Sequence, residues 1–450
     1  MSHTSLCQVA MAALSFSVFS GAPAFAQPIL GENYIYADDA DEGDVFGLCV
    51  AISGTTAIVG AHRDADGGYK SGSAYLFDTE TWDQLFKLTA FDAAANDEFG
   101  RIVAISGTTA IVGSQRDDDG GHDSGSAYLF DTETGFFISK LTASDAAVND
   151  HFGQSVAIWG TTAAVTSASE NGSCYLFDTT TGAQLAKITS SDAGEGSRLG
   201  SRVAISGTTM IIGASSESGA GTQSGSAYLF DIKTGHLLHK LTASDAAAYD
   251  GFGASVAISG TMAIVGSRDD DGEFHNTGSA YLFDTESGLQ VAKLTASDAE
   301  INDQFGNSVS ISGTTAIVGA ANDDSSTTWD SGSVYLFDTR SGLQIDKLTA
   351  PGAANDDQYG CSVAISGRTL IIGAYLDDSE EDDAGVAYLY DLPAPCFADL
   401  TGEGDLNFLD VSAFLAAFGD HEPAADFDAD GNFNFLDVSA FLAAFAAGCP

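Results

Sequence analysis

Residues 396–450 of this 450-residue chain contain the side chains whose types and spacing are most specific for chemistry. In one twelve-residue stretch, positions 1, 3, 5, 7, 9 and 12 are Asp426, Asp428, Asp430, Asn432, Asn434 and Asp437. Gly431 stands at position 6, where such a loop turns sharply, and position 7 would offer its backbone carbonyl. Because this spacing wraps oxygen ligands around one ion, we expect a calcium site here.

A second copy of the loop lies earlier in the same segment. Its positions 1, 3, 5, 7, 9 and 12 are Asp399, Thr401, Glu403, Asp405, Asn407 and Asp410, with Gly404 at position 6. Thr401 and Glu403 make it the poorer of the two sites. The alternative is a pair of solvated acidic turns, but two complete loops in tandem favour two calcium ions.

Each loop leads into the same run of residues, Asn-Phe-Leu-Asp-Val-Ser-Ala-Phe-Leu-Ala-Ala-Phe, at 407–418 and again at 434–445. The apolar residues follow a 3–4 spacing, which predicts one helix after each loop. Cys396 and Cys449 bracket the segment. They are therefore the best candidates for a disulfide in an oxidising compartment.

A loop followed by a single helix, duplicated and with Asp at position 12, resembles a type I dockerin over residues 396–450. The resemblance implies a small, duplicated EF-hand-like module that calcium folds and that attaches secreted proteins to a scaffold through a cohesin-like partner. The helices depart from the dockerin pattern by carrying Ala and Phe at the usual polar recognition positions. They would either pack on each other or offer a symmetric partner surface. A Pro-containing linker, 392–395, would precede the module.

The elements before this linker are repeated. The phrase Tyr-Leu-Phe-Asp, once as Tyr-Leu-Tyr-Asp, begins at residues 75, 128, 175, 228, 281, 335 and 388. An aromatic-Gly pair recurs in step with it, and the fourth copy is Leu199-Gly200. Each unit contains four short strand-like runs, of which the first two are joined by Ser-Gly-Thr. Seven such units predict an all-β, seven-bladed propeller of four-stranded blades over residues 27–391.

The two ends of the repeat array predict how the ring closes. Tyr34-Ile35-Tyr36 is an orphan strand before the first unit, whereas the seventh unit stops after Asp391 without a fourth strand. We therefore expect the N-terminal strand to complete blade seven, which removes the exposed edges of an open array.

The aromatic-Gly pairs and the Ile-Val-Gly-Ala phrase at 58–61 resemble the FG-GAP repeats of the integrin α-subunit head, over residues 27–395. The resemblance implies a propeller that binds or adheres to a partner. Integrin-type repeats carry a calcium loop between the first two strands, where this chain has Ser-Gly-Thr-Thr. The calcium sites of that family therefore do not carry over to these hairpins.

Acidic residues gather at two places in each unit. One is the loop between the second and third strands, as in Arg116-Asp-Asp-Asp119-Gly120, and a propeller would place these loops on one face. Weak calcium binding and recognition of a basic partner are possible there, but we favour solvated loops because a distal bidentate carboxylate is missing. The other is the run before each aromatic-Gly pair, such as Asp145 to Asp150, where we expect a turn held by Asx-type hydrogen bonds.

Charge excludes several classes of partner. The chain has 63 acidic and 16 basic residues and a formal net charge of −47. A phosphate backbone needs Lys and Arg, so the composition argues against nucleic acid, and equally against an anionic membrane surface. Divalent cations, basic partners or a saline habitat remain compatible with it.

The N-terminal segment predicts export. Residues 1–26 contain no Asp, Glu, Lys or Arg, hold an apolar run from Val9 to Phe19, and end in Ala24-Phe25-Ala26. This pattern is typical of a bacterial-type signal peptide, and the run is short for a membrane anchor, the alternative. We expect a secreted, extracellular protein without membrane insertion, or else a periplasmic or cell-surface one.

Together these features favour a non-enzymatic binding or adhesion protein whose propeller face recognises a protein or glycan and whose calcium-folded C-terminal module mediates attachment. The sequence contains no nucleophile elbow, zinc-protease helix or phosphate loop. The alternative is a carbohydrate-active, polysaccharide-degrading or quinoprotein-like propeller enzyme, because a catalytic carboxylate pair could be present among so many acidic residues.

Overall fold

The computed structural model of the chain describes residues 34–169, 172–189, 196–272, 274–325, 327–392, 406, 408–420, 425 and 432–447. The expected signal peptide, nearly all of the linker, and Cys396 and Cys449 lie outside the described residues. The chain divides into two compact units, one spanning Gln27–Pro395 and the other containing Cys396–Cys449.

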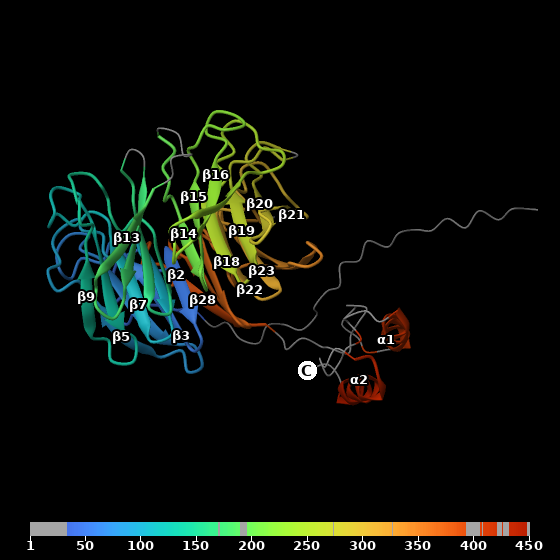
Figure 1. The fold of residues 1–450 in the computed structure, drawn as a ribbon. Helices are drawn as coiled ribbons and strands as arrows, with labels where there is room; N and C mark the ends of the chain where they lie inside the picture. The colour runs from blue at the N-terminus through green and yellow to red at the C-terminus, as the bar shows by residue number, and fades with distance from the viewer. Residues whose placement is uncertain are drawn as a thin grey trace, which may run out of the picture. The chain divides into compact units, whose positions relative to one another are not determined.

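The larger unit consists of seven four-stranded antiparallel sheets arranged as the blades of a propeller (Figure 1). The first strands of blades 1 to 7 are β2 (Cys49–Ser53), β6 (Ile102–Ser106), β10 (Val156–Trp159), β14 (Val203–Ser206), β18 (Ser255–Ser259), β22 (Ser308–Ser312) and β26 (Ser362–Ser366). The second strands are β3 (Thr56–Ala61), β7 (Thr109–Ser114), β11 (Thr162–Ser167), β15 (Thr209–Ala214), β19 (Met262–Ser267), β23 (Thr315–Ala320) and β27 (Thr369–Ala374). The third strands are β4 (Ser73–Asp78), β8 (Ser126–Asp131), β12 (Ser173–Asp178), β16 (Ser226–Asp231), β20 (Ser279–Asp284), β24 (Ser333–Asp338) and β28 (Val386–Asp391). The fourth, outer strands of blades 1 to 6 are β5 (Gln84–Leu88), β9 (Phe137–Leu141), β13 (Gln184–Ile188), β17 (Leu237–Leu241), β21 (Gln290–Leu294) and β25 (Gln344–Leu348).

The N-terminal strand closes the ring. Blade 7 has the strand order β1-β28-β27-β26, and its outer strand β1 is Tyr34–Ile35. Tyr34 pairs with Tyr388 and Ile35 with Ala387, antiparallel. The first strands of blades 7 and 1 also contact each other. The seven blades and their closure by the N-terminal strand are thereby confirmed.

The close packing of the blades explains the recurring glycines. A Cβ on Gly100, which has φ +87°, would lie 2.0 Å from the carbonyl oxygen of Ser73 in the preceding blade. A Cβ on Gly60 would lie 1.8 Å from the oxygen of Gly100. Phe99 is fully buried and belongs to a core cluster with side chains of blades 1 and 2. The aromatic-Gly pair therefore anchors each blade onto the one before it.

A ring of hydrogen bonds links the hairpins between first and second strands. At six of the seven blade junctions a hairpin glycine N–H donates to a serine hydroxyl of the preceding blade, over 3.1 to 3.3 Å. The accepting serines are Ser53, Ser106, Ser206, Ser259, Ser312 and Ser366. Trp159 replaces the serine in blade 3 and is half exposed. The bond between Gly54 of blade 1 and Ser366 of blade 7 joins the two blades at which the ring closes. The first strands therefore hold the closed ring together as well as the outer strand β1.

The smaller unit contains two helices of identical length, α1 (Phe408–Asp420) and α2 (Phe435–Ala447). The rings of Phe414 and Phe441, which occupy equivalent positions in the repeat, stack in parallel with centroids 4.1 Å apart. Both are buried, together with Ala425. Of the two arrangements expected from the sequence, packing of the helices on each other is the one observed.

Candidate functional site

Two sets of loops meet on one face of the propeller, which we call the loop face. One set joins the second and third strands of a blade, and the other joins an outer strand to the first strand of the next blade. The N–H groups of Asn149, His151 and Phe152 donate to the carbonyls of His122, Asp123 and Ser124 in the preceding blade, over 2.9 to 3.0 Å. The same three bonds recur at six of the seven blade junctions. The acidic loops therefore share one face, as the repeat predicts.

The acidic run before each aromatic-Gly pair forms a turn held by a carboxylate, as expected, but the carboxylate accepts the N–H three residues earlier and not the N–H two residues on that defines an Asx turn. Asp97 accepts the N–H of Ala94 at 2.7 Å, and the equivalent aspartates in five other blades make the same bond. Asp97 is buried, and burial raises the pKa of its carboxyl to about 6 although the bond from Ala94 opposes the rise. The equivalent Asp303 and Asp357 have pKa values raised to about 6 for the same reason.

A lysine from the outer strand lies among the acidic side chains of the loop face. In blade 2 the Lys140 ammonium lies 2.8 Å from both Asp92 and Asp117 and also contacts Asp119. It lies over the ring of Tyr128, whose hydroxyl donates to Asp117 at 2.6 Å. Burial by itself would raise the pKa of Asp117, but the bonds from Lys140 and Tyr128 hold it below its ordinary value.

This lysine–carboxylate cluster recurs in blades 1 to 6, and in five of them it spans a blade boundary, because one carboxylate follows the outer strand of the preceding blade. In blade 4, Lys240 contacts Glu217 of its own blade, and the segment that would supply the other carboxylate lies outside the described residues. In blade 1, Lys87 lies 2.7 Å from each of its three aspartates. The lysines of blades 3 to 6 are Lys187, Lys240, Lys293 and Lys347, which contact one or two carboxylates each. Blade 7 has Tyr34 opposite its third-strand tyrosine instead of a lysine, and Gly352 replaces the aspartate of blade 6. Blade 7 therefore lacks both the lysine and the carboxylate of the preceding blade, whereas its own Asp377 remains and accepts a hydrogen bond from Tyr388 at 2.8 Å.

Two of the three acidic groups whose geometry could hold a metal ion are parts of these clusters. They consist of Asp39, Asp64 and Asp66, and of Asp92, Asp117 and Asp119, among the residues that the structure describes. In both, a lysine ammonium lies among the three carboxylates. A metal ion at either place would have to displace that lysine.

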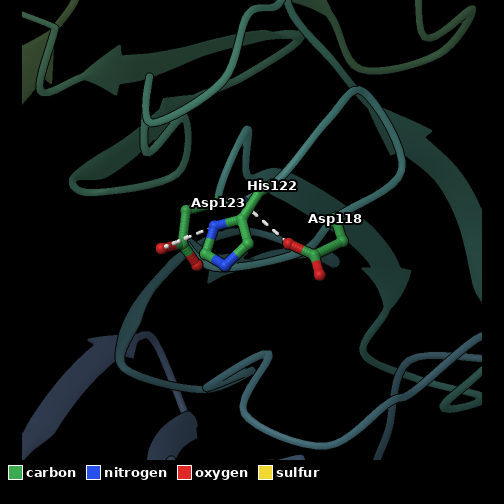
Figure 2. A group of neighbouring side chains, drawn as sticks. All are labelled: Asp118, His122 and Asp123. Atoms are coloured by element: carbon green, nitrogen blue, oxygen red, sulfur yellow. Dashed lines mark hydrogen bonds and ion pairs between the residues drawn. The ribbon is translucent and has the colours of Figure 1, made fainter.

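The third group, Asp118, His122 and Asp123, lies at the tip of a loop between the second and third strands (Figure 2). Asp118 accepts the backbone N–H of Asp123 at 2.7 Å, and His122 Nδ1 lies 3.2 Å from the Asp123 carboxylate. In blade 5, Asp271 likewise accepts the N–H of Asn276 and contacts His275. These side chains therefore close the loop on itself, which accounts for their proximity without an ion.

The tip of this loop has a constant backbone and a variable side chain. The tip residue is exposed in every blade that has the full loop, and its carbonyl accepts a bond from the next blade. The following residue has φ between +48° and +55° each time. From blade 1 onward, omitting blade 3 with its shortened loop, the tip residues are Tyr69, His122, Thr222, His275, Trp329 and Asp382. The same backbone conformation thus displays six side chains of five different residue types.

A cleft of about 570 Å³ opens on the loop face of blade 1. It lies between the segment that follows β1 and the loop that follows β3, and its lining includes six carboxylates together with Arg63, Tyr69 and Lys70. Tyr69 is 66 % exposed, with the Lys70 ammonium 5.2 Å from its ring centre.

Four of the expected calcium ligands, Asp410, Asn432, Asn434 and Asp437, lie in described parts of the C-terminal unit. Asp410 and Asp437 are fully buried near the starts of α1 and α2, and Asn432 is exposed. Asn434 and Asp437 form a capping box, because Asn434 accepts the N–H of Leu436 and Asp437 accepts the N–H of Asn434, both at 2.8 Å. The expected ligands Asp399, Thr401, Glu403, Asp405, Asp426, Asp428 and Asp430 lie outside the described residues.

The lysine–carboxylate clusters are the main feature of the loop face that sequence reasoning missed. A signal for them exists, since a lysine recurs before Leu-Thr or Ile-Thr at the end of six outer strands in a chain with only 16 basic residues. The acidic partners come from two loops of different blades, so the pairing itself could not be deduced from spacing.

A closed ring of seven antiparallel blades with loops meeting on one face defines a seven-bladed β-propeller. Seven segments match the family described as FG-GAP repeat: residues 31–77, 82–130, 136–177, 183–230, 237–283, 289–337 and 343–390. The chain belongs to this family. Each match runs from an outer strand into the third strand of the next blade, so the sequence repeat is offset from the blade. A search of curated proteins found no match. Within the described residues, none of the helices has the length and apolar character needed to cross a membrane.

Proposed function

We propose that this protein is a secreted, non-enzymatic binding protein whose loop face recognises a protein or glycan partner. The observation that carries the proposal is the tip position of the loop face, where a constant backbone displays Tyr69, His122, Thr222, His275, Trp329 and Asp382. If the tip side chains only maintained the fold, the same residue type could serve in every blade. Exposed, differing side chains on a rigid frame are instead typical of recognition surfaces.

The residue types on this surface narrow the class of partner that it would bind. Tyr69 and Trp329 expose large rings, which supply contact area at a low cost in conformational entropy. The cleft beside Tyr69 adds carboxylates that would favour basic or hydroxyl-rich groups. FG-GAP propellers are compatible with a binding or adhesion role, which supports the same conclusion.

The C-terminal unit would attach the protein to its surroundings. Each of the duplicated loops would hold one calcium ion, before α1 and before α2, and the buried Asp410 and Asp437 would be the last ligand of each. The exposed residues Phe408 and Phe435 at the helix starts would contribute to contact with a cohesin-like partner. Export through the signal segment 1–26 would place both units outside the cell.

Glycan arrays and pull-downs from the native extracellular fraction, with and without calcium, test the proposal. A bound species is expected with the full chain and should be lost in the double variant Tyr69→Ala, Trp329→Ala. Leu343→Ala is the matched control, because Leu343 is equally exposed but precedes an outer strand. Equal binding by both variants would contradict recognition by the loop tips. Turnover in reducing-sugar or dye-linked oxidation assays would contradict the non-enzymatic assignment.

A further inference from the structure

Three arginines and a histidine gather where blades 1 and 2 meet on the loop face. His62 and Arg63 follow β3, Arg101 directly precedes β6, and Arg116 follows β7. Arg101 Nη1 lies 3.5 Å from His62 Nε2. This concentration of positive charge is unusual in a chain of net charge −47 with only eight arginines.

One buried carboxylate holds two of these arginines in place. Glu98 accepts a bond from Arg101 at 3.1 Å on one oxygen, and its other oxygen lies 3.4 Å from Arg116. Gln115 donates a further bond to Glu98 at 3.3 Å. Among the described residues, Glu98 is the one carboxylate that pairs with either guanidinium. Each guanidinium has five N–H donors, both side chains are nearly half exposed, and Glu98 offers one oxygen to each, so donors remain for a further acceptor.

His62 is buried beside these arginines and is affected by their charges. Burial and the charges of Arg101, Arg63, Lys70 and Arg116 lower the pKa of His62 to about 3, so its ring is neutral. Arg101 donates to Nε2, which leaves the proton on Nδ1. This buried Nδ1 has no hydrogen-bond partner in the described part of the chain.

We propose that Arg101 and Arg116 form a binding site for an oxyanion group, a carboxylate, sulfate or phosphate, of a small ligand. Guanidinium groups match such anions with paired hydrogen bonds, and Glu98 orients both groups while offsetting only one of their two positive charges. The net charge of the whole protein repels polyanions, so the site selects a single small anion within its local field. Arg63, which flanks the pair, strengthens that field. The site is distinct from the proposed recognition of a partner by the loop tips. Small ions alone are sufficient to test it, so its failure would not affect that proposal.

Isothermal titration of the full chain with inorganic phosphate, sulfate and acetate, at an ionic strength kept constant with sodium chloride, tests the site. Saturable binding of at least one anion is expected, and the strongest of the three identifies the class. Arg116→Gln should weaken it about tenfold or more, because charge-assisted hydrogen bonds are lost. Arg340→Gln is the matched control, since Arg340 lies on the opposite face and pairs with Asp338. It should leave the affinity unchanged.

Arg101→Lys provides a second variant that keeps the charge and removes the planar fork. It should also weaken binding while retaining the native melting temperature, which guards against a trivial loss of folding. The absence of saturable binding for all three anions would overturn the proposal. Equal weakening by Arg116→Gln and Arg340→Gln would also overturn it, because that result indicates general screening rather than a site.

Discussion

Replacing Lys140 by Met should destabilise the propeller much more than the same replacement of Lys187. Both lysines occupy the same position of an outer strand, and both lie over a tyrosine ring, at 5.1 and 5.0 Å. They differ in their carboxylates. Lys140 contacts Asp117, whose side chain is only 4 % exposed, whereas Lys187 pairs with Asp145, which is 52 % exposed.

The magnitude follows from this difference in burial. Removing one partner from a buried charge pair costs about 3 to 5 kcal/mol, and Asp117 keeps its bonds from Tyr128 and from the Asp119 N–H, so we expect about 3 kcal/mol. An exposed pair such as that of Lys187 contributes less than about 1 kcal/mol. For a unit of this size, 3 kcal/mol corresponds to a fall of about 4 °C in melting temperature.

Chemical denaturation and thermal melts of both variants, with Asp117→Asn as the second arm of a double-mutant cycle, measure these terms. The coupling between Lys140 and Asp117 should be about 2 kcal/mol. The folded pKa of Asp117 is depressed, so its contribution is present above the unfolded pKa and is lost as the pH falls through the folded value. The penalty of Lys140→Met should therefore shrink below about pH 4. Equal penalties for Lys140→Met and Lys187→Met at pH 7 would refute the reasoning.

Four further predictions concern the same fold. Asp97→Asn should stabilise the propeller by about 1 to 2 kcal/mol at pH 7, and melts should show this gain shrinking below pH 6 and vanishing near pH 4: burial raises the folded pKa of Asp97 to about 6, so ionisation opposes folding above the unfolded pKa of about 4. Gly100→Ala should lower the free energy of unfolding by more than about 4 kcal/mol or abolish folding. Gly107→Ala, whose added Cβ would meet no atom within 4 Å, should lower it by about 1 kcal/mol. Similar denaturation midpoints for the two variants would contradict the close approach of the blades. Deleting residues 34–37 should lower the melting temperature and promote aggregation seen by light scattering, since the edge of blade 7 is then exposed, and unchanged melting would argue against closure. Chelation with EDTA should reduce the helical circular dichroism of the C-terminal unit and leave the propeller melt unchanged, a prediction that fails if calorimetry detects no calcium heat.

Much of the fold follows from local patterns in the sequence. The period of the repeat, the hairpin between the first two strands and the missing outer strand of blade 7 are all features of short segments, because strand and turn preferences act over a few residues. The two helices of the C-terminal unit follow from their apolar spacing in the same way. The expected calcium ligands also follow from local spacing, but most of them lie outside the described residues.

The loop face could be predicted only in part. Its acidity and the turn at Asp97 are local, and both were predictable. The lysine–carboxylate clusters join side chains from different blades, and Glu98 joins arginines that flank two different strands. Their geometry depends on how closely the blades pack, which the sequence pattern does not specify.

The sequence by itself determined the number of blades, the closure of the ring and the position of the acidic loops, because these depend on a repeated local pattern. Only the tertiary structure decided which cation balances which carboxylates. Lys140 meets Asp92 across a blade boundary and Asp117 within its own blade, where burial makes a charge without a partner costly. Electrostatic pairing of this kind depends on distance and burial, and both arise only when the blades assemble.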